Sequence, residues 1–440
     1  MRKRVLIVTY YFPPFTGVGV FRILKFAKYI NREIGSVTVL APQKAYYYIV
    51  DYNLMRYISE NRINVKYVSV NDKLMCYGYG VQYDVASPEK NLRKSRLRGF
   101  GYKVFRKAHR FFTSPVTIPD PQNFWVPKAI KEGLWLVTRE NFDVLLTSGK
   151  PFSVHLIGMM LKRKTGIKWL ADFRDPWSTN PYFDTKTLWK KLIEKKLEEK
   201  VFGQADYLIF TSEDTMNEMA CLYPQFSWKM RTITNKFDPE EFAEYPPNFR
   251  TFDSNRSTIK MIYTGALFGG KEPYALLQAI RELQDYYPNI KDRIHILFIG
   301  KLLPGKFDEY LQDEKLKVMV EYLPYMPHKD VLKVLGKCDI GILTIGRNPR
   351  FKHLIPAKLY DYMGAGLRVL AFLPADYTAA KIVRKTGIGL VIDPSDVGRI
   401  KAVLEDLLGG KNPFPRVRLE LINEYSMQQA ISELRELIIS

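Results

Sequence analysis

Cysteine is scarce in this chain. Only three occur among 440 residues, Cys76, Cys221 and Cys338, and no Cys-x-x-Cys pair is present. Their wide separation argues against a disulfide framework and against a structural zinc site. We therefore expect a protein of the reducing cytoplasm.

Long hydrophobic runs are also missing. No stretch of about 18 uncharged apolar residues is available to span a bilayer, although 46% of the residues are hydrophobic, which excludes a disordered chain. The basic start at Met1 resembles a secretory signal, but its apolar run stops at Tyr10 and leads into Pro13 and Pro14. This start is better explained as a buried first strand, so we expect a soluble or peripheral protein.

Acidic residues are few beside basic ones. The chain has 46 Asp and Glu against 67 Lys and Arg, which gives a formal net charge of +21. A charge of this size implies an anionic partner, either nucleic acid, nucleotide phosphates or a lipid surface. Composition alone does not choose among the three.

Short β-branched runs alternate with helical patterns along the chain. This alternation predicts βαβ units and parallel sheets, and the length suffices for two domains. In the first half we expect strands at Arg4–Tyr10, Ser36–Leu40, Val65–Val70, Val144–Ser148, Lys168–Phe173, Tyr207–Thr211 and Arg231–Thr234. In the second half we expect them at Ile259–Tyr263, His295–Ile299, Val318–Tyr322, Ile340–Thr344, Arg368–Phe372 and Leu390–Ile392. Helices with apolar residues at three- and four-residue spacing are expected at Phe21–Ile30, Phe124–Val137, Val154–Lys164, Leu188–Val201 and Leu419–Leu437.

A polar stretch from Pro246 to Ser257 carries two prolines and little periodicity, so we expect it to link two domains. The predicted domains are residues 1–250 and 257–412, followed by a helical segment over 413–440. Each domain is expected to be a Rossmann-like, doubly wound α/β unit, the two facing a cleft. Ligands of such sheets bind beyond the carboxyl ends of the strands, so the loops there are the candidate sites.

The first of these loops contains Gly17 and Gly19. Glycines between a strand and a helix let backbone amides approach a phosphate or a sugar. A dinucleotide fingerprint would require a third glycine at Arg22, and no Walker lysine pattern follows, so neither an NAD or FAD site nor an NTPase is indicated. A tight turn alone is the alternative.

The second candidate loop is the run Asp172-Phe173-Arg174-Asp175 at the end of an apolar strand. Carboxylates and an arginine beside a buried strand cost free energy unless they are paired or used, and this is where a doubly wound fold presents catalytic groups. Asp172 and Arg174 are therefore candidate catalytic residues, with a structural Arg174–Asp175 pair as the alternative. His155, near the preceding strand, has equal support as a packing residue and as a catalytic one.

In the second half, Gly265, Gly270 and Lys271 follow the first expected strand. Glycines with a lysine suit a diphosphate, because Lys271 can neutralise charge that develops on a departing phosphate. A surface lysine on a plain loop is the alternative.

A stronger candidate is the helix that begins near Pro356, a residue suited to a first helical turn. Its amides at Ala357 and Lys358 can meet an anion, and Lys358 adds a full charge at the same end. Asp361 lies one turn on, where a carboxylate could bind a hydroxyl beside the phosphate site. A Lys358–Asp361 salt bridge without a ligand is the alternative.

The run from Ile355 to Phe372 resembles the donor-binding helix and following strand of the retaining GT-B glycosyltransferases of family 4, the glycosyl transferases group 1. The runs Asp172–Trp177 and Asn235–Phe242 resemble the same group, and the matches together cover almost the whole chain. The resemblance implies the GT-B fold, with residues 1–250 on the acceptor side, 257–412 binding a nucleotide sugar, and the final helix crossing back to the first domain.

The resemblance also implies roles for single residues. Gly17 and Gly19 would approach the donor, Lys271 the diphosphate and Asp361 the ribose. The family's donor helix usually carries two glutamates eight positions apart. Here the second position is Asp361 and the first is His353, a departure that affects the usual carboxylate contact to the donor sugar.

Together these features predict a glycosyltransferase that uses a nucleotide diphosphate sugar, with retention of configuration implied by the resemblance. No Asp-x-Asp occurs in the chain, so no metal-bridging carboxylate pair is visible and basic residues with helix amides would stabilise the leaving diphosphate. We expect no metal and no cofactor, since the nucleotide sugar is a substrate. A nucleotide-sugar epimerase is one alternative, and a non-catalytic basic nucleic-acid-binding protein is another, although no recognisable nucleic-acid-binding module occurs.

The segment from Lys90 to Phe112 is basic and aromatic and contains no acid. Anionic lipid attracts basic residues by about 1 kcal/mol each, while aromatic rings settle at the headgroups. We therefore expect peripheral binding to the inner face of the cell membrane and a glycan or lipid-linked acceptor in cell-envelope polysaccharide assembly; a solvated basic loop is the alternative. The predicted membrane-facing residues are Arg93, Lys94, Arg96, Arg98 and Lys103. Four lysines could extend the patch, diluted by three glutamates: Lys190, Lys191, Lys195 and Lys196 against Glu194, Glu198 and Glu199.

Overall fold

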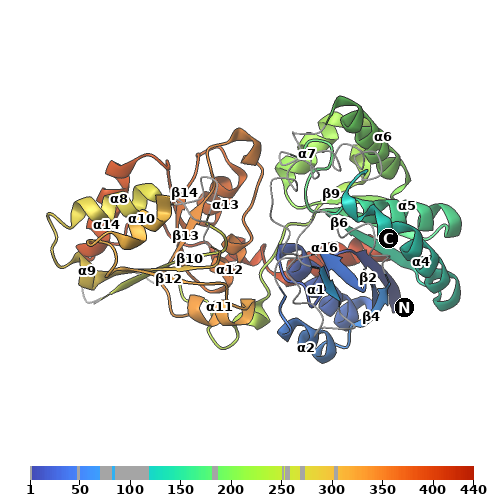
Figure 1. The fold of residues 1–440 in the computed structure, drawn as a ribbon, viewed down its shortest axis with the longest axis horizontal. Coiled ribbons are helices and arrows are strands. Elements are labelled where there is room, and N and C mark those ends of the chain that lie inside the picture. Colours follow the sequence, from blue (N-terminus) through green and yellow to red (C-terminus); the bar gives the residue numbers. More distant parts are fainter. Residues whose placement is uncertain are drawn as a thin grey trace, which may run out of the picture. The chain divides into compact units, whose positions relative to one another are not determined.

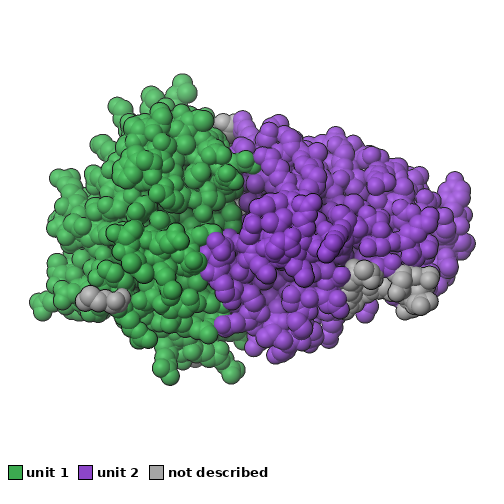
Figure 2. Space-filling view, turned by 180° about the vertical axis from the view of Figure 1, so that it is seen from behind, with its two compact units in different colours: residues 1–234, 430–440 green, residues 235–429 purple. Residues whose placement is uncertain are grey.

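The computed structural model describes residues 2–46, 50–69, 82–84, 118–180, 187–249, 252, 258–267, 273–301 and 306–440. The chain forms two compact units, unit 1 of residues 1–234 with 430–440 and unit 2 of residues 235–429 (Figure 2). The division falls at Thr234, earlier than the expected limit at residue 250. The reason is that Phe237 and Phe242, and Phe252 within the expected linker, are buried in the core of unit 2.

Unit 1 is built on a seven-stranded parallel sheet with the order β4-β2-β1-β6-β7-β8-β9 (Figure 1). The strands are β1 (Lys3–Thr9), β2 (Gly35–Pro42), β4 (Asn64–Val68), β6 (Val144–Gly149), β7 (Lys168–Phe173), β8 (Tyr207–Phe210) and β9 (Met230–Thr232). Its helices are α1 (Val18–Tyr29), α2 (Asn53–Glu60), α4 (Val126–Glu140), α5 (Ser153–Thr165), α6 (Leu188–Gln204), α7 (Glu213–Leu222) and most of α16 (Met427–Ile439). A small antiparallel pair joins β3 (Lys44–Tyr46) to β5 (Gln82–Asp84).

Unit 2 repeats this plan with six parallel strands in the order β12-β11-β10-β13-β14-β15. The strands are β10 (Ile259–Thr264), β11 (Ile294–Ile299), β12 (Val320–Leu323), β13 (Ile340–Thr344), β14 (Arg368–Phe372) and β15 (Gly389–Ile392). Its helices are α8 (Tyr274–Leu283), α9 (Ile290–Arg293), α10 (Lys306–Gln312), α11 (His328–Leu335), α12 (Lys358–Gly364), α13 (Thr378–Thr386), α14 (Val397–Leu408) and α15 (Leu419–Asn423).

Helices pack on both faces of the unit 2 sheet because its central strands are apolar on both faces. In β10, Met261 and Tyr263 face the core that α8 and α14 cover, while Ile262 faces the core that α11, α12 and α13 cover. In β1 of unit 1, every residue from Val5 to Val8 is fully buried. Strands that are apolar on both faces are typical of parallel sheets covered by helices on each side. The expected fold, two doubly wound Rossmann-like units of the GT-B type, is confirmed.

The final helix predicted over Leu419–Leu437 is broken in the structure, so the prediction of one helix was wrong. Between α15 and α16 the backbone pairs with Phe237, whose amide donates to the Tyr425 carbonyl at 3.0 Å and whose carbonyl accepts from the Met427 amide at 2.9 Å. These hydrogen bonds to Phe237 take the place of helical ones, because a backbone amide that donates to Phe237 does not donate to the preceding helical turn. The chain from Ala430 onward belongs to unit 1.

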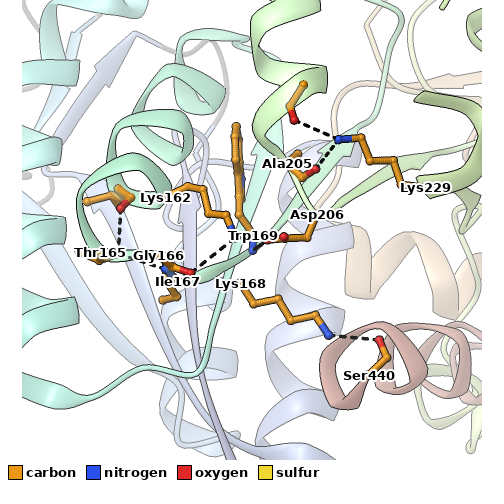
Figure 3. Close-up of polar contacts among 12 residues, drawn as sticks. Lys162, Thr165, Gly166, Ile167, Lys168, Trp169, Ala205, Asp206, Lys229 and Ser440 are labelled. Carbon is orange, nitrogen blue, oxygen red and sulfur yellow. Dashed lines mark hydrogen bonds and ion pairs between the residues drawn. The ribbon is translucent and has the colours of Figure 1, made fainter. Parts of the chain in front are cut away.

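A polar network fastens the amino-terminal edge of the sheet in unit 1 (Figure 3). The Asp206 carboxylate accepts from the Trp169 amide at 2.7 Å and from Lys162 Nζ at 2.7 Å, which ties α5 to β7 and to the start of β8. Lys229 Nζ donates to the carbonyl of Ala205 at 2.7 Å, and Lys168 Nζ donates to Ser440 Oγ at 3.1 Å. These contacts hold the starts of β7 and β8 to α5 and to the end of the chain.

Candidate functional site

In both sheets the strand order reverses beside the first strand of the unit. The reversal lies between β1 and β6 in unit 1 and between β10 and β13 in unit 2. Open parallel sheets bind ligands at such switch points, beyond the carboxyl ends of the strands. The predicted glycine loops begin at these points, after β1 and after β10.

In unit 1 the structure brings Gly19 and Arg174 together. A Cβ placed on Gly19 would lie only 1.1 Å from Arg174 Nη1, so the absence of a side chain at position 19 makes room for the guanidinium. Arg174 Nε donates to the Gly149 carbonyl at 3.1 Å, and Nη2 donates to the Lys150 carbonyl. Gly17 precedes α1 with a φ of 140°, a conformation that favours glycine. Arg174 thus joins the carboxyl ends of β6 and β7 to the start of α1.

Asp172 faces the interior and not the loop. Its carboxylate forms a bidentate ion pair with Arg22, with Nη2 at 2.7 Å from Oδ1 and Nε at 3.0 Å from Oδ2, and it also accepts from Ser148 Oγ at 2.7 Å. Both charged side chains are almost fully buried. Asp172 is thus paired with Arg22, while Asp175 Oδ2 lies 3.9 Å from Lys150 Nζ.

Two further buried groups lie under this edge of unit 1. His155 is fully buried, stacks on Phe173 at 4.2 Å and shares a hydrogen bond with Thr147 through Nδ1 at 2.9 Å. Burial lowers the pKa of His155 to about 3, opposed by the Asp172 carboxylate and reinforced by Arg174. Asp120 accepts from the Ser153 amide at the start of α5, and burial raises its pKa to about 6. His155 is therefore a neutral packing residue at physiological pH.

This burial predicts a specific pH dependence. The folded state holds His155 neutral down to pH about 3, whereas an unfolded histidine protonates near 6.5, so its contribution to stability is lost as the pH falls below 6.5. Between pH 7 and pH 5 the His155→Phe variant should lose about 2 kcal/mol less unfolding free energy than the wild type. Urea unfolding at the two pH values measures the difference. The matched variant of half-exposed His295, His295→Phe, should track the wild type; equal losses in all three proteins would contradict the buried, neutral state.

In unit 2 the structure brings Gly265 and Lys358 together at the carboxyl end of β10. Lys358 Nζ lies 3.2 Å from the centroid of the Tyr263 ring, and a Cβ placed on Gly265 would lie 3.7 Å from the same nitrogen. Gly265 has a φ of 108°, which favours glycine. The ring face attracts the ammonium group and holds it beside the glycine backbone.

The remaining predicted donor residues surround the start of α12. Ala357 is the residue before this helix, and His353 lies half-buried in the preceding loop. Asp361 contacts His328 at the start of α11, with Oδ1 at 3.5 Å from Nε2. Sequence reasoning missed His328, because α11 is far from α12 in the sequence and no motif marks it.

Several predicted residues lie outside the described part of the chain. These are Gly270 and Lys271 and the membrane-facing set of Arg93, Lys94, Arg96, Arg98 and Lys103. Within the described ranges, no three His, Cys, Asp or Glu side chains are grouped so as to hold a metal ion. In the same ranges, no helix has the length and apolar character needed to cross a membrane.

Comparisons with known proteins agree with this geometry. Residues 246–421 match the family model described as glycosyl transferases group 1. A glycosyltransferase from Rickettsia africae has a similar structure, with 13% identity and a TM-score of 0.57 over 100% of this chain and 99% of that one. An α,α-trehalose-phosphate synthase (UDP-forming) from Burkholderia xenovorans, in complex with glucose-6-phosphate, gives 9% identity and a TM-score of 0.60, covering 99% and 100%.

WaaG, a glycosyltransferase involved in lipopolysaccharide biosynthesis, gives 14% identity and a TM-score of 0.52, covering 99% of this chain and 97% of that one. A comparison with curated proteins found no match. The structural likenesses establish the fold, and the family match covers most of unit 2, including Gly265 and Lys358. The chain accordingly has the two doubly wound units of the GT-B fold, and its residues 246–421 match the family model of glycosyl transferases group 1.

Proposed function

We propose that the protein transfers a sugar from a nucleotide diphosphate sugar to a lipid-linked acceptor in cell-envelope polysaccharide assembly. The use of a nucleotide sugar donor is supported by the position of Lys358 beside Gly265. Both residues lie at the switch point of unit 2 and within the residues that match the family model. An ammonium next to a glycine backbone suits a phosphate group, because the backbone can approach the ligand closely while the charge neutralises it.

The chemistry needs charge stabilisation on the leaving nucleotide diphosphate. A cation fixed before the reaction lowers the barrier, because it does not have to reorganise as negative charge develops. Lys358 would supply this charge, with Lys271 and Gly270 as predicted partners and Asp361 as the ribose contact. In unit 1, Arg174 would contact the acceptor or the donor sugar. Asp172, two residues earlier, forms an ion pair with Arg22 that joins the end of β7 to α1.

Charge and likeness support the proposed acceptor and location. The net charge of +21 suits an anionic surface, and the similar WaaG is described as acting in lipopolysaccharide biosynthesis. We infer membership of family 4, retention of configuration, and peripheral action at the inner face of the cell membrane through residues 90–112.

The direct test is a donor screen followed by a transfer assay. A correct nucleotide sugar should raise the melting temperature of the protein through mass action, and a lipid extract should then yield a glycosylated lipid detected by mass spectrometry. If a donor stabilises the protein but no sugar is transferred to lipid, the proposal of a lipid-linked acceptor is wrong. An epimerised nucleotide sugar formed without acceptor would replace the transferase by an epimerase.

Metal independence is a separate prediction. Transfer should continue at an unchanged rate in excess EDTA, because the chain has no Asp-x-Asp pair to bridge a divalent ion to the diphosphate. Rates with EDTA, and with EDTA followed by magnesium or manganese, provide the measurement. Complete loss that either ion restores would overturn the prediction.

A further inference from the structure

The first part of helix α6 in unit 1 departs from the pattern of an ordinary surface helix, although its later residues Val201 and Phe202 are buried. Its acidic residues Glu194 and Glu198 are 2% and 0% exposed. Four large apolar side chains in its first two turns point outward instead, with exposed fractions of 80% for Leu188, 41% for Trp189, 63% for Leu192 and 41% for Ile193. Surface helices normally bury the apolar stripe and expose the charges. Within the described part of the chain, this apolar face is therefore left exposed.

The exposed apolar residues form one continuous patch. Leu188 and Leu192 are four residues apart, as are Trp189 and Ile193, so each pair stacks along the helix surface. α6 lies at the periphery of unit 1 (Figure 1). A contiguous apolar patch on a soluble protein marks a surface that contacts another apolar phase.

The charges that flank the patch are almost all positive. Lys195, Lys196 and Lys200 are exposed and follow the patch along the same helix, with Glu199 as the only exposed acid of α6. The dilution expected from the three glutamates is therefore small, because the structure turns two of them inward. Apolar side chains with a tryptophan, bordered by lysines, match a bilayer interface that offers acyl chains beneath anionic headgroups.

The inward face of α6 reaches the candidate catalytic loop. Glu198 accepts hydrogen bonds from the Ser178 amide at 3.2 Å and from the Tyr223 hydroxyl at 2.9 Å, and also from the Ser178 hydroxyl. Ser178 belongs to the segment that follows β7 and carries Arg174. One helix thus presents apolar side chains outward and holds the Arg174 loop inward.

We propose that the outward face of α6 inserts into the headgroup region of an anionic bilayer, with Leu188, Trp189, Leu192 and Ile193 as the inserted side chains. This proposal does not depend on the transfer reaction proposed above. Insertion would hold the Arg174 loop at a fixed depth from the lipid, where a membrane-bound acceptor is within reach.

Vesicle flotation of the full chain tests the proposal without donor or acceptor. The wild type should bind vesicles of equal parts phosphatidylcholine and phosphatidylglycerol, and Trp189→Ser with Leu192→Ser should weaken binding by about tenfold or more, since each buried methylene contributes to insertion. Trp135→Ser with Leu222→Ser is the matched control, because these side chains are 48% and 45% exposed elsewhere in unit 1. The control should bind like the wild type, and all three proteins should melt at similar temperatures.

A second measurement locates the contact. Lipids with a quencher at the upper acyl chain should quench part of the tryptophan fluorescence of the wild type, and this quenching should be absent in a Trp189→Leu variant that still binds. Unchanged binding of the α6 double variant would overturn the inference, as would wild-type quenching in Trp189→Leu or no vesicle binding at all. Donor stabilisation in the screen described above reads out the transferase separately, so the two proposals can fail independently.

Discussion

Replacing Arg22 by leucine is expected to lower the unfolding free energy by about 3–5 kcal/mol, the cost of leaving a buried charge without its partner. Asp172 is 0% exposed and Arg22 is 3% exposed, and the pair joins α1 to the carboxyl end of β7. Arg22 also donates to the carbonyl of Ile233 at 2.8 Å, at the end of β9. Chemical denaturation followed by circular dichroism measures the loss.

The surface pair Arg56–Glu60 provides the control. Its side chains are 83% and 56% exposed, so Arg56→Leu should change stability by less than about 1 kcal/mol. Adding Asp172→Leu to Arg22→Leu should recover part of the loss, because no unpaired charge then remains. A loss from Arg22→Leu as small as that from Arg56→Leu would show that the Arg22–Asp172 pair does not stabilise the fold.

Lys358→Ala is expected to lower the transfer rate by about a hundredfold or more, as loss of a preorganised charge does at a developing anion. The side chain is half-buried over the Tyr263 ring at the start of α12, and we expect its removal to leave the fold intact. The measurement is kcat with saturating donor and acceptor, together with the melting temperature of the variant.

Two variants sharpen this result. Lys358→Arg keeps the charge and should retain part of the rate, whereas Lys401→Ala removes a lysine of α14 that pairs with Glu282 and should leave the rate unchanged. Wild-type turnover in folded Lys358→Ala would remove the phosphate assignment. A stabilising donor that binds Lys358→Ala as tightly as the wild type, with slow turnover, would place the charge effect in the transition state alone.

The sequence predicted the fold well because the strands are apolar on both faces. β7 has the predicted limits, Lys168–Phe173, and β13 and β14 also match. Both glycine loops were expected at strand ends, and the structure brings Gly19 to Arg174 and Gly265 to Lys358. Local periodicity and turn chemistry suffice for such features, since they depend on residues close in the chain.

Features that depend on distant partners could not be predicted. Asp172 finds its partner Arg22 150 residues earlier, and no local pattern indicates that pairing. The helix break before Met427 arises from hydrogen bonds to Phe237, although the sequence there is continuously amphipathic. The periodicity of α6 predicts a helix but does not predict which face points inward. That choice depends on Ser178 and Tyr223, which donate hydrogen bonds to buried Glu198 from elsewhere in the chain.

The order of the elements along the chain has a consequence for synthesis on the ribosome. Unit 1 receives its last helix from residues 430–440, where Arg435 donates to the Glu33 carbonyl at 2.6 Å. All of residues 235–429 must be translated first, which takes roughly 10–40 s at typical elongation rates. During that interval the surface of unit 1 that α16 later covers is still exposed. A chaperone or a neighbouring nascent chain would find an apolar binding site there at this stage of synthesis.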